Sequence, residues 1–275
     1  MTDRPFNFNR PLIIGHRGFP ALYPENTMVS FEAAVRAGVG MIELDVTLSR
    51  DAEVVVIHDD TLDRTTNGSG LVSRHTLAEL RELDAGDWFH KKFAGEKLPT
   101  LDQVLAAFLD RVKINIEIKA SPAREPSYIS VVVDKVLTAV GKKDANPRVL
   151  ISSFDPEVLK TIAAGSKSHP ALALLLEEAI GEEALALSEM IGAMSIHPDM
   201  DTLDMKTIDD VRDRNLFIFP YNAESEINLR RAFEMGVDGL FVDDPVMAAR
   251  YQINARTQPS TQIVLEKTLS KTLIP

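Results

Sequence analysis

The chain has 275 residues, and its 30 Lys and Arg against 41 Asp and Glu give a formal net charge of -11. An acidic chain without a basic stripe argues against nucleic acid as the main partner. It has no cysteine, which excludes disulfides and thiolate metal sites and favours a cytoplasmic location. No apolar run approaches the roughly 20 residues of a membrane span, so we expect no stable membrane insertion.

Short runs rich in Ile, Val and Leu alternate along the chain with helix-length amphipathic stretches. The predicted strands are residues 12–15, 41–48, 53–57, 113–118, 149–153, 171–176, 193–196, 217–219 and 239–242. Clear helix signals mark residues 27–37, 127–140, 155–164 and 225–235, where Thr, Asp or Ser caps a start or Gly follows an end. This alternation predicts parallel strands joined by helical crossovers.

Nine predicted strands compete for the eight places of a closed barrel. The link at residues 49–52 is too short for a parallel crossover, which takes about a dozen residues or more. Residues 53–57 should therefore fold back on residues 41–48 as a hairpin extension. The prediction is an α/β fold, a TIM-type (β/α) eight-stranded barrel, a fold that commonly takes about 250 residues.

Two segments break this rhythm. Residues 60–100 hold the turn sequence Asn67-Gly68-Ser69-Gly70 and the single Trp88, and we expect a small insertion on the top face after the hairpin. Residues 251–275 form a polar link followed by apolar residues near helical spacing at 263–273. We expect the barrel to span residues 1–250, and residues 251–275 to be a C-terminal tail that packs outside or joins a partner subunit in a homo-oligomer.

Two predicted strands carry charge on one face. Glu43 and Asp45 share a face of their strand, about 6.6 Å apart at 3.3 Å per residue, and Glu117 lies on a later strand. Carboxylates are almost never fully buried unless they are paired or bind a metal. With no cysteine available, Mg²⁺, Ca²⁺ or Mn²⁺ is favoured over zinc. The alternative is that Glu117 forms a buried ion pair with Lys119.

Two histidines stand at predicted strand ends. His16 follows the first strand, at the rim where barrel active sites lie, and His58 ends the hairpin extension. Two imidazoles that titrate near neutrality suit a reaction that needs one acid and one base. Arg17 offers bidentate donors for a phosphate, and Lys119 offers a point charge.

Other polar residues have weaker assignments. His75, His90 and His169 are expected on the surface, and His197 is either a structural rim residue or a substrate contact. Glu25 and Asn26 belong to a proline turn before a helix and could brace Arg17. Tyr221 either presents its ring to the pocket or makes an ordinary rim contact, and Asn115 is expected to be structural.

The motifs resemble the glycerophosphodiester phosphodiesterase family over residues 11–250, in the family's order. The matching stretches are His16-Arg17-Gly18, Pro24-Glu25-Asn26-Thr27, Glu43-Leu44-Asp45-Val46, His58-Asp59, Leu62 with Arg64-Thr65-Thr66, Leu98-Pro99-Thr100-Leu101, Glu117-Ile118-Lys119, Ser153-Phe154 and residues 239–245. The resemblance implies an α/β barrel, a divalent metal, and hydrolysis of glycerophosphodiesters to sn-glycerol 3-phosphate and an alcohol.

The resemblance also implies roles for single residues. His16 and His58 match the family's acid–base pair, Glu43, Asp45 and Glu117 match its metal ligands, and Arg17 and Lys119 match its phosphate contacts. Two departures concern substrate preference, since Phe219-Pro220-Tyr221 stands where many members carry a Trp, and Val242 stands where a Thr is frequent. The alternatives are a phosphodiesterase that cleaves lysophospholipids at a lipid surface and a non-catalytic barrel that binds glycerophosphodiesters.

Overall fold

The computed structural model describes residues 11–119, 127–165 and 168–257. The barrel strands are β1 (Leu12–Gly15), β2 (Met41–Leu48), β4 (Lys113–Ile118), β5 (Val149–Ser153), β6 (Ala171–Leu176), β7 (Ser195–Pro198), β8 (Phe217–Ile218) and β9 (Gly239–Val242). They are hydrogen-bonded in the order β8-β7-β6-β5-β4-β2-β1-β9, and each neighbouring pair is parallel.

The two ends of this sheet meet. The backbone N–H groups of Asp238 and Phe241, beside and within β9, donate to the carbonyl oxygens of Ile218 and Pro220 at 3.1 and 3.0 Å. The eight strands therefore close into the predicted barrel. The ninth strand, β3 (Val54–Val56), pairs antiparallel with β2 through Val46↔Val56 and Leu48↔Val54, which confirms the hairpin extension.

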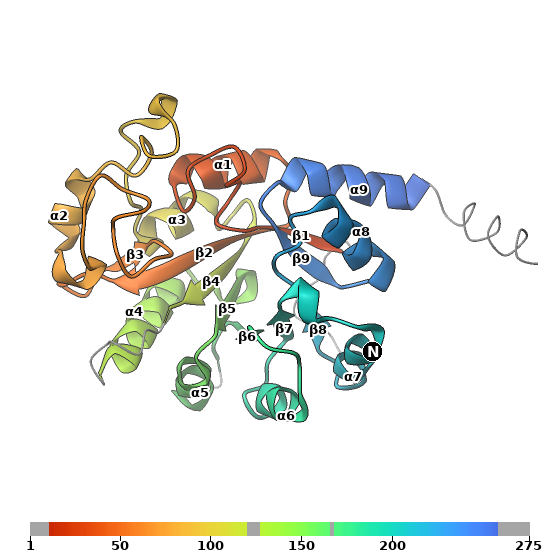
Figure 1. Ribbon diagram of the computed structural model, residues 1–275. Coiled ribbons are helices and arrows are strands. Elements are labelled where there is room, and N and C mark those ends of the chain that lie inside the picture. The colour runs from red at the N-terminus through yellow and green to blue at the C-terminus, as the bar shows by residue number, and fades with distance from the viewer. Residues whose placement is uncertain (1–10, 120–126, 166–167, 258–275) are drawn as a thin grey trace, which may run out of the picture.

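Helices form a layer outside the strands (Figure 1). They are α1 (Met28–Arg36), α3 (Leu101–Phe108), α4 (Tyr128–Lys142), α5 (Pro156–Gly165), α6 (Glu182–Met190), α7 (Met205–Asp213), α8 (Glu226–Met235) and α9 (Pro245–Thr257). The expected caps are present: the Thr27 hydroxyl accepts from the Ser30 N–H, and the Ser225 hydroxyl accepts from the Asn228 N–H. Gly236 ends α8 with a left-handed φ of 69°.

The core has two parts. The larger one lies between the strands and the helices and includes Phe31, Ile42 and Ile151. A smaller cluster consists of alternate strand residues on the other face: Leu12, Ile14, Met41, Leu150, Ala173, Phe217, Phe219 and Phe241. Because side chains alternate along a strand, these eight residues fill the barrel interior. Each fully buried large side chain contributes about 1.5–3 kcal/mol of stability.

The insertion follows β3. Its elements are η1 (Val72–Arg74), α2 (Leu77–Glu82) and η2 (Lys91–Phe93), which project beside β3 in Figure 1. It has its own apolar cluster, which includes Leu62, Val72 and Leu80, packed against Val55 of β3. The tail predicted for residues 251–275 lies largely outside the described residues and stays a prediction, because the described part of α9 stops at Thr257.

Three predicted strands differ in detail from the structure, and the first of them, β3, is one residue shorter at each end. β7 begins at Ser195, two residues later than expected, because the Ala193 N–H still bonds back to the Ser188 carbonyl at the end of α6. β8 has only two residues, and Pro220, which follows, lacks the N–H that a longer ladder would use. The pairing resumes beyond it as a single bridge between Asp199 and Tyr221.

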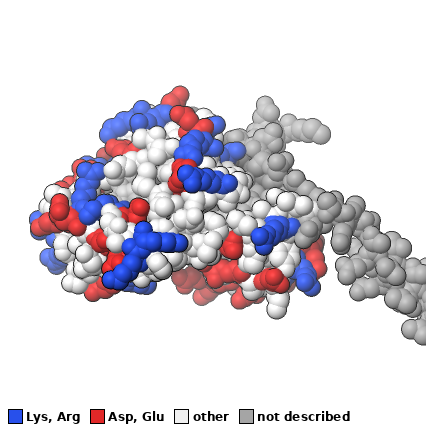
Figure 2. All heavy atoms as spheres, turned by 90° about the horizontal axis from the view of Figure 1, so that it is seen from above, with Lys and Arg blue, Asp and Glu red and all other residues white. Residues whose placement is uncertain are grey.

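None of the helices in the described part of the chain combines the length and apolarity that crossing a bilayer requires. On the face shown in Figure 2, basic and acidic side chains are interspersed, without a basic stripe among the described residues.

Candidate active site

A cavity of about 890 Å³ opens at the carboxyl ends of the strands. It lies where the inward rows of side chains turn from apolar to polar. On β1 the row runs Leu12, Ile14, His16, and on β2 it runs Met41, Glu43. Six of the seven predicted site residues line this cavity: His16, Arg17, Glu43, His58, Glu117 and Lys119. The seventh, Asp45, is 1% exposed and contacts two of them, Arg17 and Lys119.

The three predicted metal ligands lie together. The β2–β4 register places Asp45 beside Glu117 and Glu43 beside Asn115. One oxygen from each of Glu43, Asp45 and Glu117 lies within 4.8 Å of the others, and all three side chains are buried. Oε1 of Glu43 accepts no hydrogen bond from the described residues. Burial and the neighbouring Asp45 raise the pKa of Glu43 to about 8.

These carboxylates fit a divalent cation. Lys119 Nζ lies 2.7 Å from Glu117 Oε1 and 3.4 Å from Asp45 Oδ1, and Arg17 Nε lies 3.5 Å from Asp45 Oδ2. The ion pair considered as the alternative for Glu117 is thus present, but it exists within a larger cluster. Glu43 has no basic partner at ion-pair distance among the described residues, so its carboxylate, once ionised, is left without a neutralising charge and with one oxygen free for a cation.

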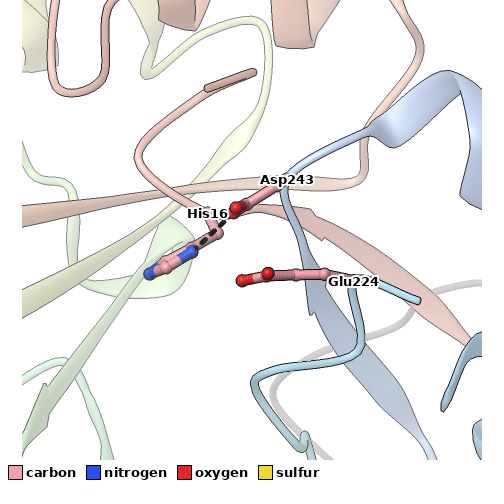
Figure 3. Close-up of side chains that lie close together, drawn as sticks. All are labelled: His16, Glu224 and Asp243. Carbon is pink, nitrogen blue, oxygen red and sulfur yellow. Dashed lines mark hydrogen bonds and ion pairs between the residues drawn. The ribbon is translucent and has the colours of Figure 1, made fainter. Parts of the chain in front are cut away.

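His16 is held by a carboxylate that the sequence interpretation missed. Its Nδ1 lies 2.8 Å from Oδ1 of Asp243, and the other ring nitrogen points away from that carboxylate (Figure 3). Burial lowers the pKa of His16, but the hydrogen bond to Asp243 and the charge of Glu43 more than offset this, so the pKa lies above 6.5. Glu224 points toward the same pair, and burial together with Asp243 raises the pKa of Glu224.

His58 has a matching arrangement. Its Nδ1 lies 2.6 Å from Oδ1 of Asp59, which in turn accepts hydrogen bonds from Arg64, at 2.7 Å from Nε to Oδ2. Arg64 also donates to both oxygens of Glu25, at 2.7 and 2.8 Å, and Glu25 accepts from Arg17 at 2.9 Å. One chain of charge-assisted bonds therefore joins His58 to Arg17. Burial lowers the pKa of His58 below 6.5.

The predicted site lacks three residues that hold its side chains in the structure: Asp59, Arg64 and Asp243. Each of them could have been found from a feature of the sequence. Asp243 is the next inward position after Phe241 on β9, so extending the strand's alternation would have found it. Asp59 and Arg64 lie within matched motifs. No local pattern showed that Arg64 reaches Glu25, 39 residues away.

The turn before α1 divides its two polar residues between two tasks. Glu25 braces Arg17, as the sequence allowed. Asn26 donates its backbone N–H to the Arg17 carbonyl at 3.0 Å, and its side chain holds Asp45: Nδ2 donates to Asp45 Oδ2 at 2.8 Å, and Oδ1 accepts from the Asp45 N–H at 3.3 Å. Asn26 has a φ of 56°, in the left-handed region that Asn tolerates, and in this conformation its side chain reaches Asp45.

The structure also gives the positions of His197, Tyr221 and Asn115 relative to the cavity. His197 is fully buried in β7, its Nε2 lies 2.9 Å from the Ser195 hydroxyl, and burial lowers its pKa to about 3. It therefore stays neutral among the aromatic rings of the interior. Tyr221 lines the cavity, and so does Asn115, whose Oδ1 accepts no hydrogen bond from the described residues.

Comparison with known proteins connects this geometry to a family. Residues 16–247 match the model of the Glycerophosphoryl diester phosphodiesterase family. A glycerophosphodiester phosphodiesterase of Caldanaerobacter subterraneus is 36% identical over 238 residues, which covers 86% of this chain and 95% of the relative. One of Bacillus subtilis is 33% identical over 250 residues, which covers 86% and 85%.

Solved structures of phosphodiesterases superpose on this fold. A phosphodiesterase of Oleispira antarctica, in complex with the product sn-glycerol-3-phosphate, superposes with a TM-score of 0.80 at 27% identity over 87% of this chain and 96% of that one. A glycerophosphodiester phosphodiesterase of Agrobacterium tumefaciens superposes with a TM-score of 0.74 at 30% identity over 86% and 98%. The chain therefore belongs to the glycerophosphoryl diester phosphodiesterase family, and it is an enzyme, a glycerophosphodiester phosphodiesterase.

Proposed function

We propose that the enzyme hydrolyses glycerophosphodiesters to sn-glycerol 3-phosphate and an alcohol, with a divalent cation and with His16 and His58 as its acid–base pair. One observation carries this proposal: two carboxylate-held imidazoles line the same cavity as Glu43, Glu117 and the basic residues Arg17 and Lys119. The product bound in the Oleispira relative supports the proposed product.

Glu43, Asp45 and Glu117 would hold the cation, which we expect to be Mg²⁺ or Ca²⁺, with Mn²⁺ also compatible with an all-oxygen set. When bound, such a cation supplies Lewis-acid stabilisation of the negative charge that develops on the phosphoryl oxygens. Arg17 and Lys119 bind those oxygens directly. Glu25 and Glu117 hold the two basic side chains in place at 2.9 and 2.7 Å, which orients them before substrate arrives.

The two histidines move the protons. A carboxylate accepts from each Nδ1, so Nδ1 carries hydrogen and Nε2 is left for the substrate. The raised pKa of His16, set by Asp243 and Glu43 against its burial, suits a proton donor to the departing alkoxide. The pKa of His58, lowered by burial, suits an acceptor of a proton from the attacking hydroxyl, which belongs to water or to the neighbouring glycerol carbon.

Neither alternative function gains support. Family membership as an enzyme removes the non-catalytic barrel. The lysophospholipid alternative depended on residues 263–273, which lie outside the described residues. A cytoplasmic location and a homo-oligomer stay predictions from the sequence.

The test is to measure sn-glycerol 3-phosphate released from a panel of glycerophosphodiesters, with and without EDTA, and then with Mg²⁺, Ca²⁺ or Mn²⁺ restored. We expect EDTA to reduce the rate at least ~100-fold, because a Lewis acid contributes several kcal/mol to such a step. Activity that survives EDTA would remove the cation from the proposal, and failure to release sn-glycerol 3-phosphate would overturn the proposed reaction.

A further inference from the structure

One arginine of the insertion connects two parts of the site from outside the cavity. Arg64 lies in the turn that opens the insertion, and it is not among the described residues that line the cavity. Leu62 of this turn is fully buried in the insertion's apolar cluster, and its carbonyl accepts from the N–H and the hydroxyl of Thr66 at 3.1 and 2.7 Å. The backbone that carries Arg64 is therefore held by the packing of the insertion.

The Arg64 guanidinium divides its donors between two carboxylates. Nε and Nη2 donate to Oδ2 and Oδ1 of Asp59 at 2.7 and 2.9 Å. Nη1 and Nη2 donate to Oε2 and Oε1 of Glu25 at 2.7 and 2.8 Å. A planar guanidinium suits such paired contacts, which are stronger than bonds between neutral groups. Since two carboxylates repel each other, Arg64 is the group that joins Asp59 to Glu25.

Each carboxylate in turn holds a group of the proposed chemistry. Asp59 Oδ1 lies 2.6 Å from Nδ1 of His58, and Glu25 Oε1 lies 2.9 Å from Nη1 of Arg17. The side chain of Glu25 is only 10% exposed, so water would replace a lost partner poorly. A displacement of the Arg64 guanidinium would therefore disturb the proton acceptor and the phosphate contact together.

We propose that Arg64 is a positioning residue, whose guanidinium holds the His58 ring and the Arg17 side chain in one fixed relative arrangement. This inference rests on the proposed function, since it concerns two groups of the same site. It also gives the insertion a part in catalysis, although none of the seven proposed site residues lies in it.

Both carboxylates stay ionised in this network. The hydrogen bond from Arg64 lowers the pKa of Asp59 to about 2, against its partial burial. Burial raises the pKa of Glu25, but its bonds to Arg64 and Arg17 more than offset this, so that the pKa lies below 4.5. Because neither carboxylate changes its charge near neutral pH, Arg64 should act by fixing geometry.

The first experiment replaces Arg64 and measures kcat and KM for a glycerophosphodiester such as sn-glycero-3-phosphocholine. We expect Arg64→Met to lower kcat, to raise KM and to lower kcat/KM by about 10²-fold, because a displacement of about 1 Å at reacting groups has an effect of this size. If Arg64 only fastened the insertion to the barrel, the folded variant would keep both constants.

Two further variants separate geometry from charge. Arg64→Lys keeps the charge, but a single ammonium cannot reproduce the paired contacts, so it should not restore activity. Arg50→Met is the matched control. Arg50 also joins the hairpin to the insertion, through the Arg74 carbonyl at 3.1 Å and Glu79 at 3.3 Å, away from the cavity. This control should keep the wild-type kcat and KM.

A double-mutant cycle tests whether Arg64 couples the two parts. Glu25→Gln and Asp59→Asn each weaken one of them, and their combined effect on kcat/KM should be at least ~3-fold smaller than the product of the single effects. In an Arg64→Met background the two effects should multiply, because the group that connects them is gone.

The His58 ring supplies a readout that needs no turnover. In enzyme labelled with 15N-histidine, the NMR signal of the hydrogen on Nδ1 of His58 reports its bond to Asp59. Glu25→Gln should shift or broaden this signal, although Glu25 reaches His58 only through Arg64 and Asp59, and it should add no effect to Arg64→Met. Glu25→Gln keeps Arg64, so the comparison with wild type stands even where Arg64→Met fails to fold.

Wild-type kcat and KM in folded Arg64→Met, full activity of Arg64→Lys, or a coupling that persists without Arg64 would each overturn the positioning role. Hydrolysis of no glycerophosphodiester by the wild type would instead overturn the proposed function. The NMR comparison would then decide the role of Arg64 by itself, and a His58 signal that Glu25→Gln leaves unchanged would contradict it.

Discussion

At the scale of single residues, the site depends on how two imidazoles are fixed. His16 and His58 each engage a carboxylate through Nδ1, Asp243 at 2.8 Å and Asp59 at 2.6 Å. Such a contact sets the ring's orientation and its tautomer, so the remaining nitrogen is available for proton transfer. The two pKa values shift in opposite directions, which fits the two proton-transfer roles proposed for these rings.

Removal of either imidazole should therefore lower kcat strongly and change the free energy of unfolding little. We expect His16→Ala and His58→Ala each to lower kcat by about 10²- to 10⁴-fold, the usual contribution of one general acid or base. His75→Ala is the matched control, since His75 lies in the insertion and its side chain forms a hydrogen bond with the Leu71 carbonyl, away from the cavity. Steady-state kinetics on folded variants is the measurement, and near-full turnover in both site variants would contradict the assignment.

The pH profile should respond to Asp243. His16 must be protonated to act as the acid, so kcat/KM should fall as pH rises through its pKa. Asp243 raises that pKa, so Asp243→Asn should move the alkaline limb of the profile to lower pH. The acid limb belongs to His58 and Asp59 and should stay in place. A profile in which the alkaline limb does not move would show that Asp243 does not tune His16.

At the scale of elements, the turn from β1 into α1 holds Arg17 against Glu43 of β2. Arg17 has a φ of 50° and Gly18 a φ of 94°, both in the left-handed region. In this conformation the Arg17 N–H donates to Oε2 of Glu43 at 2.7 Å, while the Ser30 hydroxyl holds the turn by accepting from the Phe19 N–H at 2.8 Å. The turn thus joins Arg17, the proposed phosphate contact, to Glu43, a proposed metal ligand.

Gly18 should tolerate no side chain. A Cβ there would lie 2.4 Å from the Ser30 hydroxyl and 2.7 Å from the Ser30 carbonyl carbon, in addition to the strained φ. We expect Gly18→Ala to lower the free energy of unfolding by about 1–3 kcal/mol and to lower kcat/KM as well. Gly141→Ala in α4, where a Cβ meets nothing within 4 Å, should instead raise stability by up to ~1 kcal/mol. Denaturant unfolding measures both, and equal effects would contradict this reading of the turn.

At the scale of the whole molecule, the barrel concentrates buried negative charge at one end. Glu43, Asp45 and Glu117 are buried together, and among the described residues Arg17 and Lys119 are the basic side chains at ion-pair distance from them. Burial and Asp45 raise the pKa of Glu43 from 4.5 to about 8. A raised carboxyl pKa means that the folded state loses stability as the group ionises, over the range from about pH 4.5 to 8.

Without a cation, the protein should therefore become less stable as pH rises from 5 to 8. Glu43→Gln should flatten this slope, and the control Glu178→Gln, which removes an exposed carboxylate after β6, should not. Adding a divalent cation at about 100 times its Kd should stabilise the wild type by ~2.7 kcal/mol through mass action and should stabilise Glu43→Gln less. Urea unfolding after EDTA treatment is the measurement. A slope that Glu43→Gln leaves unchanged would contradict the origin assigned to it.

The sequence by itself determined the strands, their inward faces and the seven proposed site residues, because strand alternation and turn chemistry depend on neighbouring residues. Glu43 and Asp45 share a face wherever their strand lies. The same alternation, carried past the strand ends, leads to Asp243 and to the cavity-lining residues Phe154, Glu177, Asp199 and Tyr221, although only the closed barrel shows that these rows meet around one cavity.

Only the tertiary structure decided the long-range partners. His16 and Asp243 are 227 residues apart, and Arg64 and Glu25 are 39 apart. Such pairs depend on barrel closure, on the β2–β4 register and on where the insertion lies, and no local pattern in the chain specifies these. The same holds for the burial of His197, which the sequence left as a rim residue or a substrate contact, and which lies inside the barrel because β7 continues through Pro198.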